Sequence, residues 1–509
     1  MPHISDVKES YIRDWQVPPK ERPVVMASLG CHLSGAALPH PDPSDCRTMK
    51  AGVLKRFLMK PPQAEPELRT LLKAFVRRWC SDNLVPLQPN TDLTVESWLQ
   101  QTTYPAWRKE QLLRKYRAVI DPLDSKYHVV KSFMKDECYE EYKHARAINS
   151  RSDEFKCFVG PTFKAIEKSV FKLDWFIKKI PVKDRPDYIV KRLGHGKKFY
   201  ATDFTAYESH FDRETMEAIE FILYEYLTQY LPNHEDFMYY CHNVLAGTNR
   251  CIFKFFEVQV EATRMSGEMC TSLGNGFSNL MLMLFLCDYK GCTGVHGVVE
   301  GDDGLFTMEG NHPTTEDFKN LGFTIKMEEH ERISDASFCG LLFDPEDLVI
   351  VTNPLTELAT FGWTTQQYAH SSSRRKMELL RCKAISLGYQ YGGCPILTSL
   401  ARYGLRITKN YRAKPGRMNQ WEADQFYEAK LYSKGVLREV PLRTRLLVER
   451  LYKINISTQL KIEKYLDSLD TLTVLKFPEL DLLIPQHWKH FWFFYVSDLN
   501  KRFPDQNIA

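Results

Sequence analysis

Apolar residues recur along much of the chain at spacings of three and four, which place them on one face of a helix. The pattern predicts helices over residues 67–80, 213–230 and 270–287, and over 96–116 in pieces around Pro105. Beyond about residue 354 it is mainly helical, including 443–452 and 458–469. An aromatic-rich stretch over 488–494 fits either the core of this helical region or an exposed stacking platform.

Short apolar runs of a different kind predict strands. They lie at residues 199–204, 295–299, 305–308 and 323–327, with a short helical pattern at 316–321. Residues 1–64 are rich in Pro and Gly and predict an extended segment laid over the rest of the chain. These patterns together predict an α+β fold.

The composition is that of an ordinary globular protein. Of the 509 residues, 43% are hydrophobic and 26% are charged, which excludes disordered and collagen-like classes. No apolar run reaches the roughly 20 residues that a membrane-spanning helix needs. The 13 cysteines include no C-x-x-C pair, so we expect reduced thiols and no disulfide framework.

Charge is unevenly distributed, although the formal net charge is only +4. Residues 131–200 hold 17 Lys or Arg against 10 Asp or Glu, and residues 371–417 hold 11 against one. Basic tracts of this kind are typical of surfaces that face a polyanion. Solvated faces without a partner are the alternative interpretation.

Two adjacent carboxylates lie at a predicted tight turn. Asp302 and Asp303 stand between Gly301 and Gly304, with apolar strand patterns on both sides. Glycine permits turn backbone angles that a side chain would block. A plain hairpin turn is the alternative, because Gly and Asp are common turn residues.

A further acid ends another predicted strand. Asp203 closes the run at 199–204, and Glu208 follows it in a D-x4-E spacing. Oxygen ligands from two chain segments suit Mg²⁺, and two such ions about 3.5–4 Å apart can activate a hydroxyl and stabilise a leaving pyrophosphate. The sequence therefore predicts that Asp203 and Asp302 converge on a shared pair of metal ions.

A polar helix face is predicted between these acids. Ser266 and Gly267 form a loop, and Thr271, Asn275 and Asn279 then fall on one face of the helix. Such a face beside a metal site can hydrogen-bond sugar hydroxyls. An amphipathic helix with incidental polar residues is the alternative interpretation.

In their order along the chain, these segments resemble motifs A, B and C of RNA-dependent RNA polymerases of positive-strand RNA viruses, within the tombus-like, noda-like and flavi-like assemblage. The resemblance implies a right-hand polymerase with fingers, palm and thumb, an antiparallel palm sheet flanked by helices, and a mainly helical thumb. It implies an N-terminal extension with fingertips over 1–64, fingers over 65–195, a palm over 196–354 with a fingers insertion around 230–265, and a thumb with a C-terminal segment over 355–509.

Further segments match this family. Residues 133–137 and 143–151 resemble the basic fingers motif that lines the nucleotide channel, and 103–109 resemble a template-channel motif. Residues 321–326 resemble motif D, 337–343 the hairpin that grips the primer, and 392–397 a thumb segment. Two departures are Glu208, where relatives usually carry Asp, and Glu300 before Gly301, for which the sequence alone offers no physical account.

The resemblance assigns candidate roles to thirteen residues. The catalytic set is Asp203, Asp302, Asp303 and Lys326, of which the three aspartates bind metal and the lysine donates a proton to pyrophosphate. Nucleotide and ribose binding is assigned to Lys135, Lys143, Arg146, Arg151, Glu208, Ser266, Gly267, Thr271 and Asn275.

The implied activity is template-directed transfer of nucleotides from NTPs to an RNA 3′-OH, with two Mg²⁺ ions or Mn²⁺ in their place, replicating a positive-strand RNA genome. The implied partners are RNA template and product, NTPs and other viral replication proteins. The implied location is the host cytoplasm, at membrane-associated replication complexes reached through a partner or precursor. A reverse transcriptase and a catalytically silent RNA-binding or scaffolding protein are the alternatives.

Overall fold

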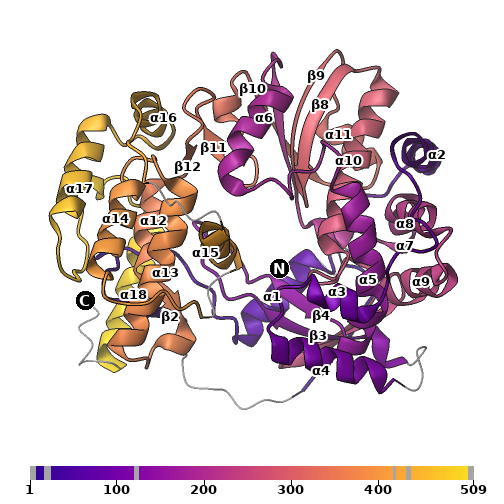
Figure 1. Cartoon of the computed structure of the whole chain (residues 1–509), viewed down its shortest axis with the longest axis horizontal. Helices are drawn as coiled ribbons and strands as arrows, with labels where there is room; N and C mark the ends of the chain where they lie inside the picture. The colour runs from indigo at the N-terminus through magenta and orange to yellow at the C-terminus, as the bar shows by residue number, and fades with distance from the viewer. Residues whose placement is uncertain (1–6, 16–23, 120–124, 417–419, 432–436, 503–509) are drawn as a thin grey trace.

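The computed structural model describes residues 7–15, 24–119, 125–416, 420–431 and 437–502. Helices and sheets are mixed, as the sequence predicts. Two sheets with their covering helices occupy one side of the molecule, and a mainly helical region occupies the other (Figure 1). Within the described residues, no helix is both long and apolar enough to cross a membrane.

The central sheet has four antiparallel strands in the order β10-β5-β9-β8. These are β5 (Phe199–Phe204), β8 (Thr293–Glu300), β9 (Asp303–Glu309) and β10 (Ile325–His330). The prediction for 199–204 is confirmed at both ends, and the other three strands also lie where the sequence predicts them, with different ends.

Helices cover both faces of this sheet. Phe199 and Ala201 on β5 pack in one core with α6 (Arg185–Leu193), whereas Tyr200 and Phe204 pack in another with α10 (Thr271–Lys290). The second face also carries α2 (Pro66–Asn83), α7 (Arg213–Ala218), α8 (Glu220–Thr228) and α11 (Thr315–Asn320). The helix predicted over 213–230 is therefore interrupted, between α7 and α8 at Ile219.

A second sheet has five strands in the order β1-β7-β6-β3-β4. They are β1 (Tyr11–Asp14), β3 (Val129–Met134), β4 (Ala147–Ser150), β6 (Thr248–Ile252) and β7 (Phe256–Glu261). Only β3 and β6 are parallel. Helix α1 (Cys46–Arg56) packs against this sheet in one core. Helices α5 (Asp153–Val170) and α9 (His234–Tyr240) belong to the core that contains α2, α8 and α10, and α3 (Val95–Gln100) and α4 (Ala106–Arg117) contact α5. The hydrophobic pattern did not predict this sheet.

The region after residue 354 is mainly helical, as predicted. It contains α12 (Pro354–Phe361), α13 (Ser373–Tyr391), α14 (Leu397–Ile407), α15 (Gln420–Leu431), α16 (Leu442–Tyr452), α17 (Ile456–Ser468) and α18 (Gln486–Arg502). The short strands β11 (Leu342–Phe343) and β12 (Ile350–Val351) pair just before it. On α18, Trp488 is buried in the core while Phe493 and Phe494 are exposed, so the aromatic stretch is divided between the two interpretations.

The N-terminal segment links both parts of the molecule. Strand β1 joins the five-stranded sheet, and β2 (Met26–Ser28) pairs with β13 (Trp363–Thr365) beside the helical region. The backbone N–H groups of Val25 and Met26 donate to the Tyr495 hydroxyl on α18 at 3.0 and 2.9 Å. The prediction of an extended segment is wrong for α1, which Asp45 caps by accepting from the Arg47 N–H at 3.1 Å.

Candidate active site

The end of β5 and the turn between β8 and β9 lie at the same end of the central sheet. Glu300 pairs with Asp303 across the hairpin, which leaves Gly301 and Asp302 as the turn. Thr202 pairs with Gly304, so Asp203 follows directly beside the start of β9. Side chains alternate along strands, so Asp203 and Asp303 both fall on the face that α6 covers. The structure thus brings the acids of the two segments together.

Each of these carboxyl groups has a raised pKa. Removal from water raises the pKa of Asp302 to about 6, with further increases from the Glu208 and Asp203 carboxylates. Burial and the charges of Asp302 and Asp203 raise the pKa of Asp303 to about 7. Burial also raises the pKa of Asp203, although Lys143, Lys326 and Arg56 oppose the shift. The acids therefore affect one another electrostatically, as members of one site.

The three carboxylates have the chemistry needed to bind a divalent cation. No ion pair joins Asp203, Asp302 or Asp303 to any residue in the described part of the chain, so their negative charge lacks a close counter-ion. Hard oxygen donors with uncompensated charge are the ligands that Mg²⁺ takes. Among the described residues, however, there is no preformed metal site made of three or more His, Cys, Asp or Glu side chains.

Lys326 stands directly across from Asp203 in the β10–β5 register. Its amine forms an ion pair with Glu328 at 2.6 Å, and both side chains are exposed. The hydrogen bond to Glu328, with a smaller contribution from Asp203, raises the pKa of Lys326. The structure therefore places the predicted proton donor beside the acids and keeps it protonated.

Helix α10 contacts the carboxylate turn through a residue that the prediction did not assign to the site. The Asn279 side-chain Nδ2 donates to the Gly301 carbonyl at 3.2 Å and to the Asp303 carbonyl at 2.9 Å. Asn279 is 1% exposed. Its position on the polar face of the predicted helix was the available signal, but its partners are backbone atoms of the turn and not a sugar.

The other polar residues of this segment differ in how far they are available to a ligand. The Thr271 hydroxyl donates to the Met265 carbonyl at 3.1 Å. Asn275 is mostly buried, and its Oδ1 accepts from Arg264 Nε at 2.9 Å. The Ser266 carbonyl accepts from the Asn149 N–H at 2.7 Å, which fixes the loop that Gly267 continues with φ of 106°. The predicted helix face consists of Thr271, Asn275 and Asn279. Within the described contacts, Asn275 is the one of these residues whose side-chain donor, Nδ2, makes no hydrogen bond.

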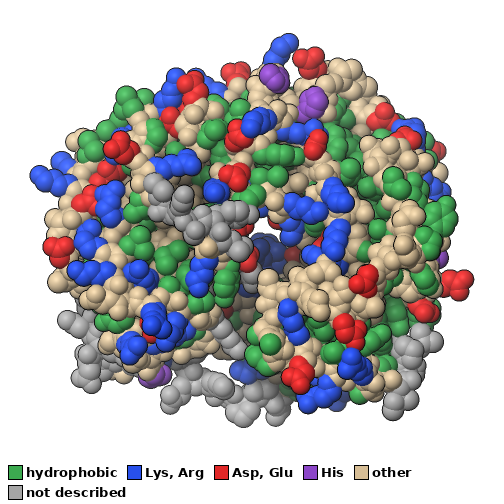
Figure 2. All heavy atoms as spheres, viewed as in Figure 1, with side chains coloured by type: hydrophobic (Ala, Val, Ile, Leu, Met, Phe, Trp, Pro, Cys, Tyr) green, Lys and Arg blue, Asp and Glu red, His purple; other side chains and the backbone are tan. Residues whose placement is uncertain are grey.

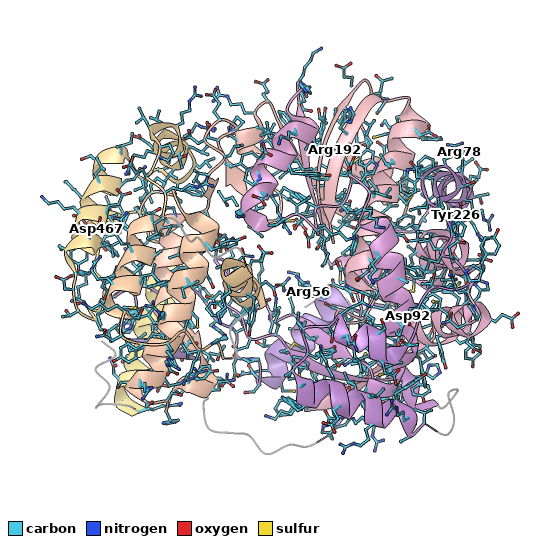
Figure 3. All side chains as sticks on the ribbon, in the orientation of Figure 1. Arg56, Arg78, Asp92, Arg192, Tyr226 and Asp467 are labelled. Carbon is cyan, nitrogen blue, oxygen red and sulfur yellow. The ribbon has the colours of Figure 1, made fainter. Side chains whose placement is uncertain are left out.

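Glu208 is held by an arginine from the N-terminal segment. Arg56, at the end of α1, forms an ion pair with the Glu208 carboxylate at 3.7 Å. The Glu208 carbonyl accepts from the Arg264 N–H at 3.1 Å. Arg56 points toward the middle of the molecule (Figure 3), where a hollow opens with Lys and Arg side chains at its edge and in its depth (Figure 2). The N-terminal segment thus contributes directly to the candidate site.

The predicted basic residues occupy different environments. Arg146 makes a bidentate pair with Glu137, at 2.6 and 2.9 Å, and Lys135 also pairs with Glu137, at 2.8 Å. Lys135 and Arg146 line a cavity of about 560 Å³ that α12 and α13 close on the other side. Lys143 is exposed and acts electrostatically on Asp203, as Arg146 acts on Asp302. Lys143 and Arg146 therefore influence the carboxylate site, whereas the described contact of Lys135 is with Glu137.

Arg151 differs from the prediction. Its guanidinium is buried and donates to the Glu268 carboxylate at 2.7 Å, to the Asn249 Oδ1 at 2.5 Å and to the Tyr127 carbonyl at 2.9 Å. An arginine whose donors are used in this way is a structural residue, because a phosphate would have to displace buried partners. The sequence pattern did not distinguish it from its neighbour Arg146.

Much of the basic tract at 371–417 also serves the fold. Arg406 donates to the Leu466 and Leu469 carbonyls at the end of α17, and Arg381 donates to the Thr408 carbonyl at the end of α14. Lys383 donates to two carbonyls near β13. Basic side chains at helix ends satisfy carbonyls that have no partner within the helix. Among the described members of the tract, the exposed Lys409 and Arg412 remain available to a polyanion.

The structure gives a physical account of Glu300. Its carboxylate forms ion pairs with Arg185 at 3.2 Å and Lys178 at 3.7 Å. Arg185 is buried on α6, where a carboxylate balances its charge. Glu300 therefore joins the carboxylate hairpin to the helix that covers it.

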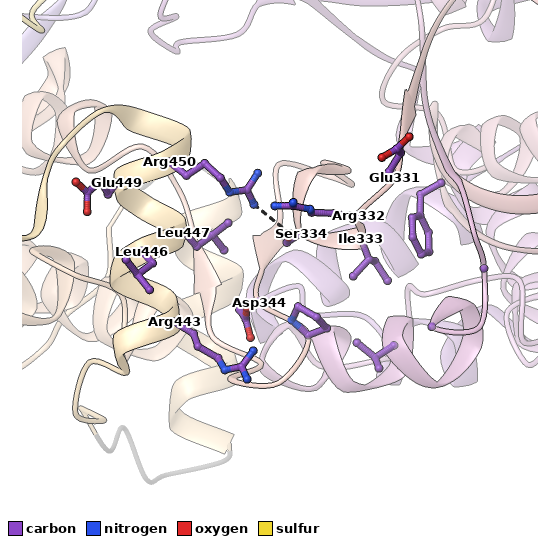
Figure 4. Close-up of a pocket in the computed structure, with 15 residues that line it drawn as sticks. Glu331, Arg332, Ile333, Ser334, Asp344, Arg443, Leu446, Leu447, Glu449 and Arg450 are labelled. Atoms are coloured by element: carbon purple, nitrogen blue, oxygen red, sulfur yellow. Dashed lines mark hydrogen bonds between the residues drawn. The ribbon is translucent and has the colours of Figure 1, made fainter.

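A second cavity lies away from these residues. It measures about 820 Å³ and opens between α6, the segment after β10, and α16 (Figure 4). Arg332, Ser334 and Arg443 line it, and Arg450 donates to the Ser334 hydroxyl at 3.2 Å. None of the predicted site residues lines this cavity, so it is separate from the carboxylate site.

Comparison with known proteins agrees with the resemblance in the motifs. Residues 242–474 match a family model described as viral RNA dependent RNA polymerase. This segment includes the Asn275 helix, the Asp302–Asp303 turn and Lys326, whereas Asp203 lies before it.

One curated relative of this class is the RNA-directed RNA polymerase of Turnip crinkle virus. The two are 25% identical over an alignment of 239 residues, and the match covers 44% of this chain. The match covers 30% of the length of that relative. The predicted similarity to polymerases of positive-strand RNA viruses is thereby confirmed for this part of the chain.

Proposed function

We propose that the chain is a viral RNA-directed RNA polymerase that transfers nucleotides from NTPs to an RNA 3′-OH under the direction of an RNA template. The observation that carries the proposal is the position of Asp203 beside the Gly301–Asp303 turn. Two carboxylate-bearing segments, 99 positions apart from Asp203 to Asp302, meet at one end of one sheet. The family match over 242–474 supports the same activity.

Asp203 and Asp302 would hold two Mg²⁺ ions, with Asp303 adjusting the charge of the site. When bound, such a pair of ions supplies activation of the 3′-OH and stabilisation of the leaving pyrophosphate. Lys135, Lys143 and Arg146 bind the triphosphate, because cations paired with phosphate oxygens orient the leaving group. Lys326 donates a proton to pyrophosphate, and Glu208 and Asn275 read the ribose.

The proposed arrangement is a right hand. The central sheet lies in the palm over 196–354. Strands β3, β4, β6 and β7 of the five-stranded sheet belong to the fingers, over 65–195 with the insertion around 230–265, and the helical region over 355–509 is the thumb. Residues 1–64 form the fingertips. The contact of Arg56 with Glu208 and the pairing of β2 with β13 support this role for the N-terminal segment.

Replacing Asp302 by Ala tests the activity. Wild-type protein should extend a primed RNA template with NTPs and Mg²⁺, and D302A should lower incorporation by a factor on the order of 10³ or more, since a metal-binding acid is lost. Filter binding should show unchanged affinity for RNA. Asp187→Ala, at an exposed ion pair with Lys191 on α6, is the matched control and should keep full activity.

Each other outcome identifies an alternative. Incorporation retained by D302A refutes the assignment of the site. Preferential use of dNTPs by the wild-type protein favours a reverse transcriptase. RNA binding without extension in either Mg²⁺ or Mn²⁺ favours a catalytically silent RNA-binding or scaffolding protein.

The proposed role extends to replication of a positive-strand RNA genome in the host cytoplasm. RNA template and product are the polymer partners, and other viral replication proteins are further partners. Recruitment to membrane-associated replication complexes would occur through one of these partners or a precursor. Co-purification with membranes, in cells that do and do not contain the other viral proteins, tests this location.

A further inference from the structure

Arg264 connects three parts of the candidate site. Its backbone N–H donates to the Glu208 carbonyl at 3.1 Å. Its side chain donates from Nη2 to Glu220 Oε1 at 2.5 Å and from Nε to Asn275 Oδ1 at 2.9 Å. The guanidinium also lies 4.3 Å from the centre of the Phe211 ring. One residue thus joins Glu208, helix α8 and helix α10.

The Arg264–Glu220 pair is deeply buried, with side-chain exposures of 3% and 1%. The Tyr224 hydroxyl donates to the second Glu220 oxygen at 2.7 Å, which helps to satisfy the carboxylate. A Cβ at Gly274 would approach Glu220 Oε2 to 2.3 Å and Arg264 Nη2 to 2.7 Å. The glycine therefore allows α10 to lie against the ion pair, and the pair holds the guanidinium in one position.

The contact decides the orientation of the Asn275 amide. A guanidinium has only donors, so the amide atom that faces Arg264 must be the oxygen. The Nδ2 group then points away from Arg264, and it donates to no residue in the described ranges. The Tyr207 hydroxyl donates to the Asn275 carbonyl at 3.2 Å. One turn further along α10, Asn279 Nδ2 donates to the Gly301 and Asp303 carbonyls of the carboxylate turn. The free donor therefore lies in the neighbourhood of the carboxylate site.

We infer that Arg264 is a positioning residue for sugar selection: through the Nε contact it fixes the Asn275 amide as a hydrogen-bond donor to the ribose 2′-OH. The inference rests on the proposed polymerase function. It assigns to Arg264 the selection of ribonucleotides over deoxyribonucleotides by the polymerase. A 2′-deoxynucleotide has no oxygen to accept from Asn275, so it leaves the donor unpaired. Without Arg264 the Asn275 amide can rotate, and the preference for ribonucleotides over 2′-deoxynucleotides declines.

Arg264→Lys is the informative variant. Lysine keeps a positive charge for Glu220, but it lacks the planar fork that reaches Asn275 at the same time. The readout is the ratio of kcat/KM for ATP to that for 2′-deoxyATP on one primed template. A lower folded fraction affects both substrates equally and cancels in the ratio. We expect the ratio to fall about 10- to 100-fold, as for loss of one hydrogen bond in a buried site.

A double-mutant cycle with Asn275→Ala separates positioning from a structural role. Because Arg264 acts through Asn275, R264K should not lower the ratio further in the N275A background. Arg445→Lys, at the bidentate pair with Glu463 between α16 and α17, is the matched control and should leave the ratio unchanged. An unchanged ratio in R264K, or a further fall in the double variant, overturns the inference.

Equilibrium binding of ATP and 2′-deoxyATP to the protein with primed template provides a readout that needs no turnover. Wild-type protein should prefer ATP, and R264K should lose that preference. If the wild type binds with this preference but incorporates nothing, the proposed activity fails while the positioning role stands. Equal binding of both nucleotides by the wild type overturns the positioning role.

Discussion

Lys326 and Asp203 are directly paired across the β10–β5 ladder, so both side chains emerge on the same face of the sheet. The amine of Lys326 is also paired with Glu328 two residues further along β10. The protonation of Lys326 is therefore linked to a residue that does not itself belong to the predicted site.

Glu328→Gln should shift the alkaline limb of activity toward lower pH. The hydrogen bond to Glu328 is the main cause of the raised Lys326 pKa, so its removal lets the amine lose its proton at lower pH. The shift should stay below about one pH unit because both groups are exposed. The measurement is a pH profile of single-nucleotide incorporation, with Glu331→Gln as control. An unshifted limb would exclude Lys326 as the proton donor.

Asn279→Ala should misplace the carboxylate turn. Two carbonyls of the turn lose their donor, which should lower the free energy of unfolding by about 1–3 kcal/mol and reduce kcat while RNA affinity is unchanged. Urea unfolding and single-turnover kinetics measure the two effects. Asn243→Ala removes one exposed hydrogen bond to the Tyr239 carbonyl and should be nearly neutral. Full activity in N279A would show that the turn does not need this contact.

Mg²⁺ should stabilise the protein more at high pH than at low pH. The pKa values of Asp302 and Asp303 are raised to about 6 and about 7. Without metal, the folded state is therefore stabilised by holding these two protons, and this contribution to the free energy of unfolding is fully present below the ordinary pKa of 3.8. It is lost as pH rises through about 6 to 7 and the acids ionise without a counter-ion. A bound cation offsets that loss only when the acids are ionised.

The corresponding measurement is the gain in melting temperature on adding Mg²⁺, at about pH 8 and at about pH 5. We expect a clear gain at the higher pH and a small one at the lower. Replacing both Asp302 and Asp303 by Asn should remove most of the gain at the higher pH. An equal gain at both values would mean that Mg²⁺ binds elsewhere.

Glu300→Gln should destabilise the fold through Arg185. The substitution keeps the size of the side chain but leaves a buried guanidinium without its counter-charge, at a cost of about 1–3 kcal/mol in the free energy of unfolding. Glu316→Gln, which removes an exposed pair with Lys319, should cost less than about 0.5 kcal/mol. Urea unfolding compares the two variants. Equal losses of unfolding free energy in the two variants would show that the Glu300–Arg185 pair stabilises the fold no more than an exposed ion pair does.

The central sheet was predictable because short apolar runs mark β5, β8 and β9, whereas β10 carries only Ile325 and Met327 as alternating apolar residues. The run at 199–204 follows Lys197 and Lys198, and its side chains alternate between two cores. The five-stranded sheet lacks this signal. Strand β6 contains a buried Asn249 and an exposed Arg250. Strand β7 follows it directly as a partner, but its parallel partner β3 lies far away in the chain.

The carboxylate site was predictable in its acids and less so in its supporting residues. Asp203 and the Asp302–Asp303 turn follow strand patterns, so sequence spacing indicates their convergence. The Glu220–Arg264 pair joins residues 44 positions apart and interrupts no periodic pattern, so nothing local marks it. Arg151 and Arg146 look alike in sequence, and only their partners separate a buried structural arginine from one beside the site.

The pairing of Val25 and Met26 with Tyr495 has a consequence for biosynthesis, because 470 residues separate the first contact pair. At roughly 5–20 residues per second, the ribosome needs on the order of 20–90 s to deliver the hydroxyl that these amides bind. Until residues 363–365 are made, β2 has neither β13 nor α18 as a partner, and α18 is made later still. The nascent chain therefore carries unpaired strand edges through most of translation, which makes its N-terminal segment a natural substrate for chaperones.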